Sequence, residues 1–173
     1  MFTNRTQLKR RTPDNGVDRE NYLSLLVDEY INTNSFDNKC QVLANLANFA
    51  YDPINYGYIR DVGVLDIFMF VLKNESNEKL LHFATAGICN LCNDPANIDY
   101  IVQHQVLKPL TLLLKSSNCD IVADTITIFI YLNNSHAKGS IRLAEVITEV
   151  KSLSTSDNKT IGNLAKIFIE ETK

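Results

Sequence analysis

The sequence of 173 residues lacks the features that mark several large classes of protein. Glycine and proline are scarce, at 6 and 4 residues, and they fall mainly where helices would end, as long helices with short turns require. No apolar run approaches the roughly 20 residues of a membrane-spanning helix, and no secretion signal is recognisable at the N-terminus. We therefore expect the 4 cysteines to be reduced thiols of a cytosolic or nuclear protein.

A surplus of positive charge is also missing, since 17 Lys and Arg face 20 Asp and Glu. A protein that binds nucleic acid mainly through phosphates needs such a surplus. The exception is the segment 1–17, whose charged residues are Arg5, Lys9, Arg10, Arg11 and Asp14. We expect 1–17 to be a disordered basic tail that precedes one folded domain over 18–173. The charge of this tail would still allow contact with RNA, an acidic partner or a nuclear import receptor.

An internal repeat is the strongest pattern that the sequence contains. A shift of 42 residues aligns segment 48–73 with segment 90–115. Chance would give roughly one or two identities over this length, whereas the identical pairs are Asn48/Asn90, Asp52/Asp94, Pro53/Pro95, Asn55/Asn97, Tyr58/Tyr100, Ile59/Ile101, Val64/Val106, Leu65/Leu107, Leu72/Leu114 and Lys73/Lys115. A period near 42 is typical of armadillo and HEAT solenoids, which are stacks of short helical units.

Three helices can be placed in each unit. Asp52–Pro53 and Asp94–Pro95 predict helix starts, because Asp accepts hydrogen bonds from free N–H groups and Pro has none to donate. The predicted short first helices cover 53–60 and 95–102, and the second cover 64–73 and 106–115. The predicted long third helices cover 36–51, 77–92 and 119–133, the last of these aligned by a shift of 41. The order short, short, long favours armadillo units over HEAT units, which usually have two helices.

The two ends of the stack need helices that hide its terminal apolar faces. An amphipathic pattern over 18–32 predicts an N-terminal capping helix, and a pattern over 158–171 predicts a last long helix in a truncated unit. The predicted fold class is therefore all-α, a short right-handed α-solenoid of about three to four armadillo units.

Residues that could support catalysis or metal binding are few. Cys89 and Cys92 form a CxxC pattern, but the repeat aligns them with Ala47 and Ala50, which favours packing over a zinc site or a thiol enzyme. The three histidines lie in different units and show no metal-pair spacing; they are His82, His104 and His136. We predict no enzyme activity, no cofactor, no metal and no small-molecule substrate.

The third helices of a solenoid line its inner surface, so residues repeated there face a possible partner. The amides of Asn48 and Asn90 would match the alternating donors and acceptors of an extended peptide. Alternatively, each Asn could hold the turn toward Asp52 or Asp94, and both interpretations stay open. Tyr131 occupies the corresponding position in the next unit and shortens the Asn ladder. The predicted partner-binding residues are Ala44, Asn45, Asn48, Tyr51, Ala86, Asn90 and Tyr131.

Four segments resemble one armadillo-repeat family over about residues 22–171; they read VLANLANFAYDP at 42–53, YIRDVGVLDIF at 58–68, GICNLC at 87–92 and NLAKIFI at 163–169. The resemblance implies a nuclear, non-catalytic scaffold of the minor (U12-type) spliceosome, acting in pre-mRNA splicing. It further implies an RRM-type partner, RNA-binding motif protein 48, with RNA contact at most indirect or through the basic tail. The alternative is an independent adaptor that binds extended or basic peptide segments.

Overall fold

The computed structural model describes residues 2–12, 16–140 and 144–172. Within these ranges it contains eleven α-helices, two short 3-10 helices and no strand. The prediction of an all-helical chain is therefore confirmed over the described part. None of these helices is long and apolar enough to cross a membrane.

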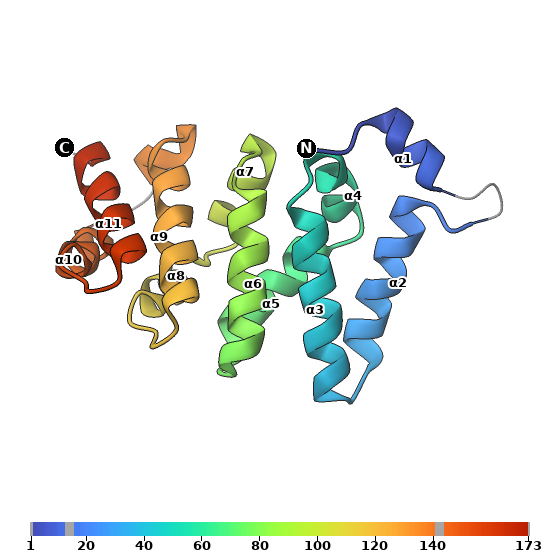
Figure 1. The fold of residues 1–173 in the computed structure, drawn as a ribbon, viewed down its shortest axis with the longest axis horizontal. Helices are drawn as coiled ribbons and strands as arrows, with labels where there is room; N and C mark the ends of the chain where they lie inside the picture. Colours follow the sequence, from blue (N-terminus) through green and yellow to red (C-terminus); the bar gives the residue numbers. More distant parts are fainter. Residues whose placement is uncertain (1, 13–15, 141–143, 173) are drawn as a thin grey trace.

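The long helices stand side by side in one layer (Figure 1). They are α3 (Phe36–Ala50), α6 (Glu78–Leu91), α9 (Cys119–Asn133) and α11 (Lys159–Glu171). Each packs against the next in this order. Their first residues are separated by 42, 41 and 40 positions, which confirms the repeat period read from the sequence. Each of the four begins after a side chain that caps its free N–H groups, namely Ser35, Asn77, Asn118 and Asn158.

The short helices form the rest of each unit. Asp94 caps α7 (Pro95–Gln103) as predicted, accepting from the N–H groups of Ala96 and Asn97. The corresponding segment after Asp52 is divided into a 3-10 helix, Pro53–Asn55, and α4 (Tyr56–Asp61), where the sequence predicts one helix.

The second helices are α5 (Val64–Asn74) and α8 (Leu107–Leu113), of which α8 is shorter than the predicted 106–115. Gly63 begins α5 in the left-handed region, with φ of 76°, a conformation that glycine adopts without strain. In the last unit a 3-10 helix, His136–Ser140, precedes α10 (Ala144–Leu153), which the sequence analysis does not place.

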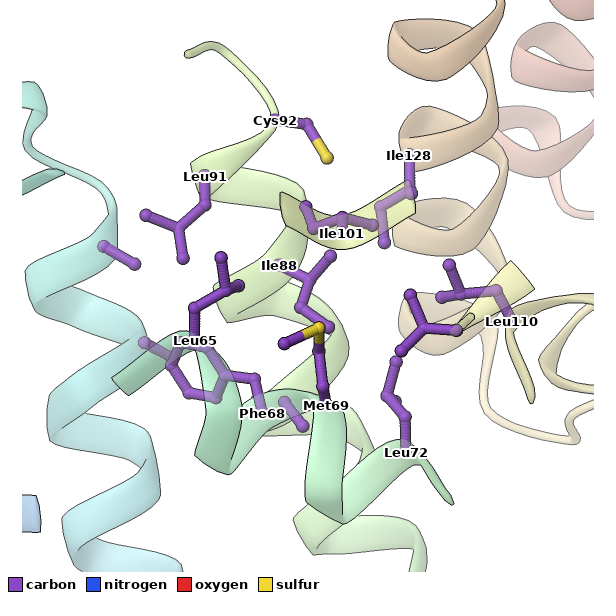
Figure 2. Close-up of a cluster of buried hydrophobic side chains, with 14 of the residues drawn as sticks. Leu65, Phe68, Met69, Leu72, Ile88, Leu91, Cys92, Ile101, Leu110 and Ile128 are labelled. Atoms are coloured by element: carbon purple, nitrogen blue, oxygen red, sulfur yellow. The ribbon is translucent and has the colours of Figure 1, made fainter. Parts of the chain in front are cut away.

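A continuous core joins the units (Figure 2). Figure 2 shows side chains from α5 and α6, such as Phe68 and Ile88, beside Ile101 of α7, Leu110 of α8 and Ile128 of α9. All five are fully buried. Because consecutive units share this apolar layer, each unit contributes to the stability of its neighbours.

Helices close both ends of the stack. At the N-terminal end, α2 (Arg19–Asn32) packs on α3 and buries Leu23, Leu26 and Tyr30, which confirms the predicted capping helix. At the C-terminal end, α11 packs on α9 and buries Phe168. Each end helix therefore buries apolar side chains against its neighbour, although Leu25 and Ile31 of α2 and Ile167 of α11 remain exposed.

The N-terminal segment differs from the disordered tail that the sequence predicts. The structure places a helix, α1 (Arg5–Arg11), within residues 1–17. Asn4 and Gln7 each accept a hydrogen bond from the other's backbone N–H, a reciprocal cap that stabilises the first turn. The N–H of Thr3 also donates to Oδ2 of Asp52 at 3.0 Å, which attaches the segment to the solenoid. Residues 13–15 of this tail lie outside the described residues.

Candidate partner-binding surface

One side of the long-helix layer is open to solvent. Helix α3 packs against α2 and α6 at its sides, and α6 packs against α3, α5 and α9. The accessible residues on α3 include a set at helical spacing, Gln41, Ala44, Asn45 and Asn48. Those on α9 include Asp120, Ala123, Asp124, Thr127 and Tyr131. We call the accessible sides of α3, α6 and α9 the long-helix surface; in Figure 1 these helices lie in front of α5 and α8.

All seven predicted residues lie on the long helices or directly after one. Asn48 and Tyr51 are exposed, and Tyr51 directly follows α3 with 64% of its surface accessible. The others are half-buried: Ala44, Asn45, Ala86, Asn90 and Tyr131. Asn45 accepts a hydrogen bond from the amide of Gln41 at 3.3 Å. Their assignment to partner binding stays a prediction.

Asn90 connects two units. Its Nδ2 donates to the carbonyl of Ala47 at 3.2 Å, so α6 is fastened to α3. The backbone carbonyl of Asn90 also accepts from the hydroxyl of Tyr56 at 2.8 Å. One N–H of the Asn90 side-chain amide is therefore already used in a hydrogen bond inside the solenoid. Asn48 is the more accessible of the two asparagines that the sequence predicts for peptide binding.

The turns after α3 and α6 are each held by an asparagine other than Asn48 and Asn90. Nδ2 of Asn55 donates to the carbonyl of Phe49 at 2.8 Å, and Nδ2 of Asn97 donates to that of Leu91 at 3.0 Å. Both asparagines are buried. The repeat alignment contains this pair, but the sequence analysis does not single it out, because an Asn–Asn identity alone does not separate a structural amide from a binding one.

Side-chain bonds also join the short helices of neighbouring units. Nη1 of Arg60 donates to Oδ1 of Asn97 at 2.8 Å and lies 3.3 Å from Oδ1 of Asp94. The hydroxyl of Tyr100 donates to Asp66 at 2.7 Å. A partner would thus meet a surface whose helices are held in place before binding, which lowers the entropy cost of association.

The surface is acidic between α6 and α9. Burial raises the pKa of Asp124 to about 6, although the nearby His82 lowers it and Asp120 raises it further.

Burial, with a contribution from Asp124, raises the pKa of Cys89 to about 12, and burial raises that of Cys92 well above its usual value. Both thiols are therefore protonated near neutral pH, which disfavours a nucleophile or a metal ligand. Cys92 is packed in the core, as the repeat alignment predicts.

The histidines lie in three separate settings. His104 stacks on Tyr100, with 4.0 Å between ring centroids, and His136 pairs with Asp99 of the preceding unit. Nδ1 of His82 is buried, and no hydrogen-bond partner for it lies among the described residues. Over the same residues, no three His, Cys, Asp or Glu side chains gather in a way that could hold a metal ion.

Comparison with known proteins identifies the family. Armadillo repeat-containing protein 7 of the mouse is 41% identical over 160 residues, which are 91% of this chain and 80% of the mouse protein. The chain belongs to the family of armadillo repeat-containing protein 7. The resemblance noted in the sequence is thereby confirmed. No protein-family model matches the chain.

Solved structures agree with this assignment at the level of the fold. A computationally designed armadillo repeat protein for modular peptide recognition has a TM-score of 0.78 and 19% identity, covering 86% of this chain. A designed armadillo repeat protein in complex with the peptide (KR)4 has a TM-score of 0.77 and 17% identity, covering 87% of this chain. The chain spans 63% and 64% of the lengths of these two proteins. The family member is therefore an armadillo solenoid, as predicted.

Proposed function

We propose that this family member is a non-catalytic scaffold subunit of the minor spliceosome. In this proposal it acts in the nucleus during pre-mRNA splicing and supports an RRM-type partner, RNA-binding motif protein 48. The membership of the armadillo repeat-containing protein 7 family supports a protein-binding scaffold. The finer assignment rests on what the sequence resemblance implies.

The long-helix surface is the observation that carries the proposal. Its central residues are accessible although the helices beneath them are fixed by the core and by bonds such as that from Asn90 to Ala47. Asn48 offers two donors and one acceptor to a partner. The exposed ring of Tyr51 adds a large apolar face with a polar tip, a side chain that often dominates binding energy.

Co-expression with RNA-binding motif protein 48 tests the proposal. We expect a one-to-one complex on size exclusion with light scattering, and a loss of affinity of about tenfold or more for Asn48→Ala/Tyr51→Ala. Lys73→Ala/Lys108→Ala, at exposed residues of α5 and α8, is the control and should bind normally. Asn90→Ala is measured separately with its Tm, because it also removes the bond to Ala47. Failure of the two proteins to co-purify would contradict the partner.

The second candidate function is an independent adaptor for basic, extended peptides. Asp120 and Asp124 favour it, because both are accessible carboxylates on α9 beside the proposed surface. The peptide (KR)4 is a suitable probe, measured by fluorescence anisotropy at two salt concentrations. Salt-sensitive binding of the peptide that Asp120→Asn/Asp124→Asn weakens, together with no binding of the RRM-type protein, would favour the adaptor. Binding of the RRM-type protein alone would favour the scaffold.

A further inference from the structure

The exposed face of α1 is basic. Arg5 and Lys9 are one helical turn apart and lie on the same side of α1, whereas Arg10 is turned about 100° from Lys9 around the helix axis. All three cations are exposed, whereas Leu8 is half-buried. This positive stripe contrasts with a chain whose net charge is -3.

The stripe is attached to the solenoid next to exposed aromatic rings. The N–H of Thr3 donates to Asp52, and the ring of Phe2 lies 5.6 Å from that of Tyr51 between centroids. These bonds place the start of α1 beside the end of α3. Figure 1 shows α1 at the N-terminal end of the stack, above α2 and α3.

A second group of rings and a fourth cation adjoin the first. The guanidinium of Arg19 lies 4.7 Å from the ring centroid of Phe49, and Tyr22 meets the same ring edge-on at 5.7 Å. Phe2 and Tyr22 are exposed by 56% and 43%. Phe49 precedes Tyr51 by two residues, so both groups of rings lie at the same end of α3.

Of the carboxylates described near α1, those of Asp52 and Asp18 are engaged in hydrogen bonds. Burial raises the pKa of Asp52, but hydrogen bonds from Thr3 and Ile54 and the charge of Arg19 outweigh it and lower the pKa overall. Asp18 accepts from the N–H of Asn21 as the cap of α2. Glu20 is the exposed acidic residue in the first turn of α2. Among the described residues, the three exposed cations of α1 outnumber this one exposed carboxylate.

We propose that these residues form a binding surface for single-stranded nucleic acid. Arg5, Lys9 and Arg10 would neutralise phosphates, and the exposed rings of Phe2 and Tyr22 would stack on bases. Cations beside aromatic rings are the combination that single strands require, because every base has a π-face and every nucleotide a phosphate. An acidic protein would need the cations but would make little use of several exposed rings. This surface adjoins the long-helix surface at Tyr51, but its binding of nucleic acid does not require the partner proposed above.

The test uses the full chain without any partner and a fluorescein-labelled twelve-nucleotide oligouridine. We expect salt-dependent anisotropy between about 50 and about 200 mM salt, with binding loosened at the higher concentration. Arg5→Gln/Lys9→Gln/Arg10→Gln should weaken binding by at least about tenfold and lower the salt slope by about two, since each contact to a single strand contributes about 0.7. The control Lys108→Gln/Lys151→Gln/Lys159→Gln changes the net charge equally at exposed lysines elsewhere, and should retain binding.

The rings need their own variant. Phe2→Leu/Tyr22→Leu keeps every charge, so we expect a loss of about fivefold or more with an unchanged salt slope. Unchanged circular dichroism separates these losses from unfolding. The proposal is overturned if oligouridine does not bind at low salt, or if the α1 triple variant and the control triple variant weaken its binding equally. It is also overturned if an oligoglutamate or an anionic lipid vesicle competes as well as unlabelled oligouridine does. RNA-binding motif protein 48 is left out of this experiment, so the outcome does not depend on whether the scaffold proposal is correct.

Discussion

Asp124 on α9 combines a carboxylate, partial burial and a nearby histidine. Burial raises its pKa to about 6, with His82 acting in the opposite direction. The folded chain therefore binds a proton at this site between about pH 4 and 6, where the unfolded chain has already lost it. The stability contributed by the protonated group is present below this window and is lost as the pH rises through it. At neutral pH the charged carboxylate is a cost to the fold.

We therefore expect Asp124→Asn to stabilise the chain at about pH 7.5 and to change little near pH 4. Because the side chain is partly exposed, solvent screening limits the gain to about 1 kcal/mol. For a chain of this size that is a rise in Tm of about 3 °C, measured by thermal unfolding at both pH values. Glu170→Gln, at an exposed carboxylate of α11, is the control. A lower Tm for Asp124→Asn at pH 7.5 would show that the favourable charge interaction with His82 outweighs the cost of burial.

The sequence predicts the structural role of a single residue where that role involves only residues close to it in the chain. The Asp94 cap follows from an Asp–Pro pair alone, because it involves the next three residues of the chain. The bond from Asn90 to Ala47 spans 43 positions and depends on how α6 is aligned beside α3. Periodicity predicts that these helices are neighbours, but it does not set which amide meets which carbonyl.

At the scale of the elements, the close packing of α5 against α6 requires the glycine at position 87, which has no side chain. Gly87 of α6 faces the ring of Phe68, and a Cβ at this position would lie 2.5 Å from two of its carbons. Both residues are buried. Gly57 in α4 is the matched case, because a Cβ there would meet nothing within 4 Å.

Gly87→Ala should therefore lower the free energy of unfolding by about 1–3 kcal/mol, because the overpacked ring must move and this outweighs the helix preference of alanine. Gly57→Ala should raise it by about 0.5–1 kcal/mol. Urea unfolding of both variants gives the comparison. In a double-mutant cycle, Phe68→Leu should reduce the cost of Gly87→Ala. Equal effects of the two alanines would mean that α5 and α6 can separate without loss.

Elements were predicted where the repeat places them. All three of the early long helices and the last one agree with the structure within two residues at either end. Helix α1 was missed because its cap, Asn4 with Gln7, is followed by basic residues and not by an apolar stripe. Helix α10 lies where the alignment with earlier units fades, although Val146, Ile147 and Val150 have the spacing of a buried face.

At the scale of the whole molecule, the chain is a line of units in which each contacts its neighbours. Helix α11 packs on α9 and α10, while α6 packs on both α3 and α9. Stability in such a stack is a sum of unit terms and neighbour terms, so a defect at one end need not unfold the other. Phe168 of α11 and Phe68 of α5 provide a matched pair, because both are fully buried phenylalanines.

We expect Phe168→Ala and Phe68→Ala each to cost about 3–5 kcal/mol where they act. The helices in which amide hydrogen exchange becomes faster should nevertheless differ between the two variants. Phe168→Ala should speed exchange in α9, α10 and α11 and leave α3 nearly unchanged, whereas Phe68→Ala, in the middle of the shared core, should speed exchange throughout the described helices. If Phe168→Ala instead loosens α3 as much as α11, the chain unfolds as one cooperative unit. In that case the long-helix surface on α3, α6 and α9 would depend on α11 at the C-terminal end of the stack, because α11 would then contribute to the stability of all three helices.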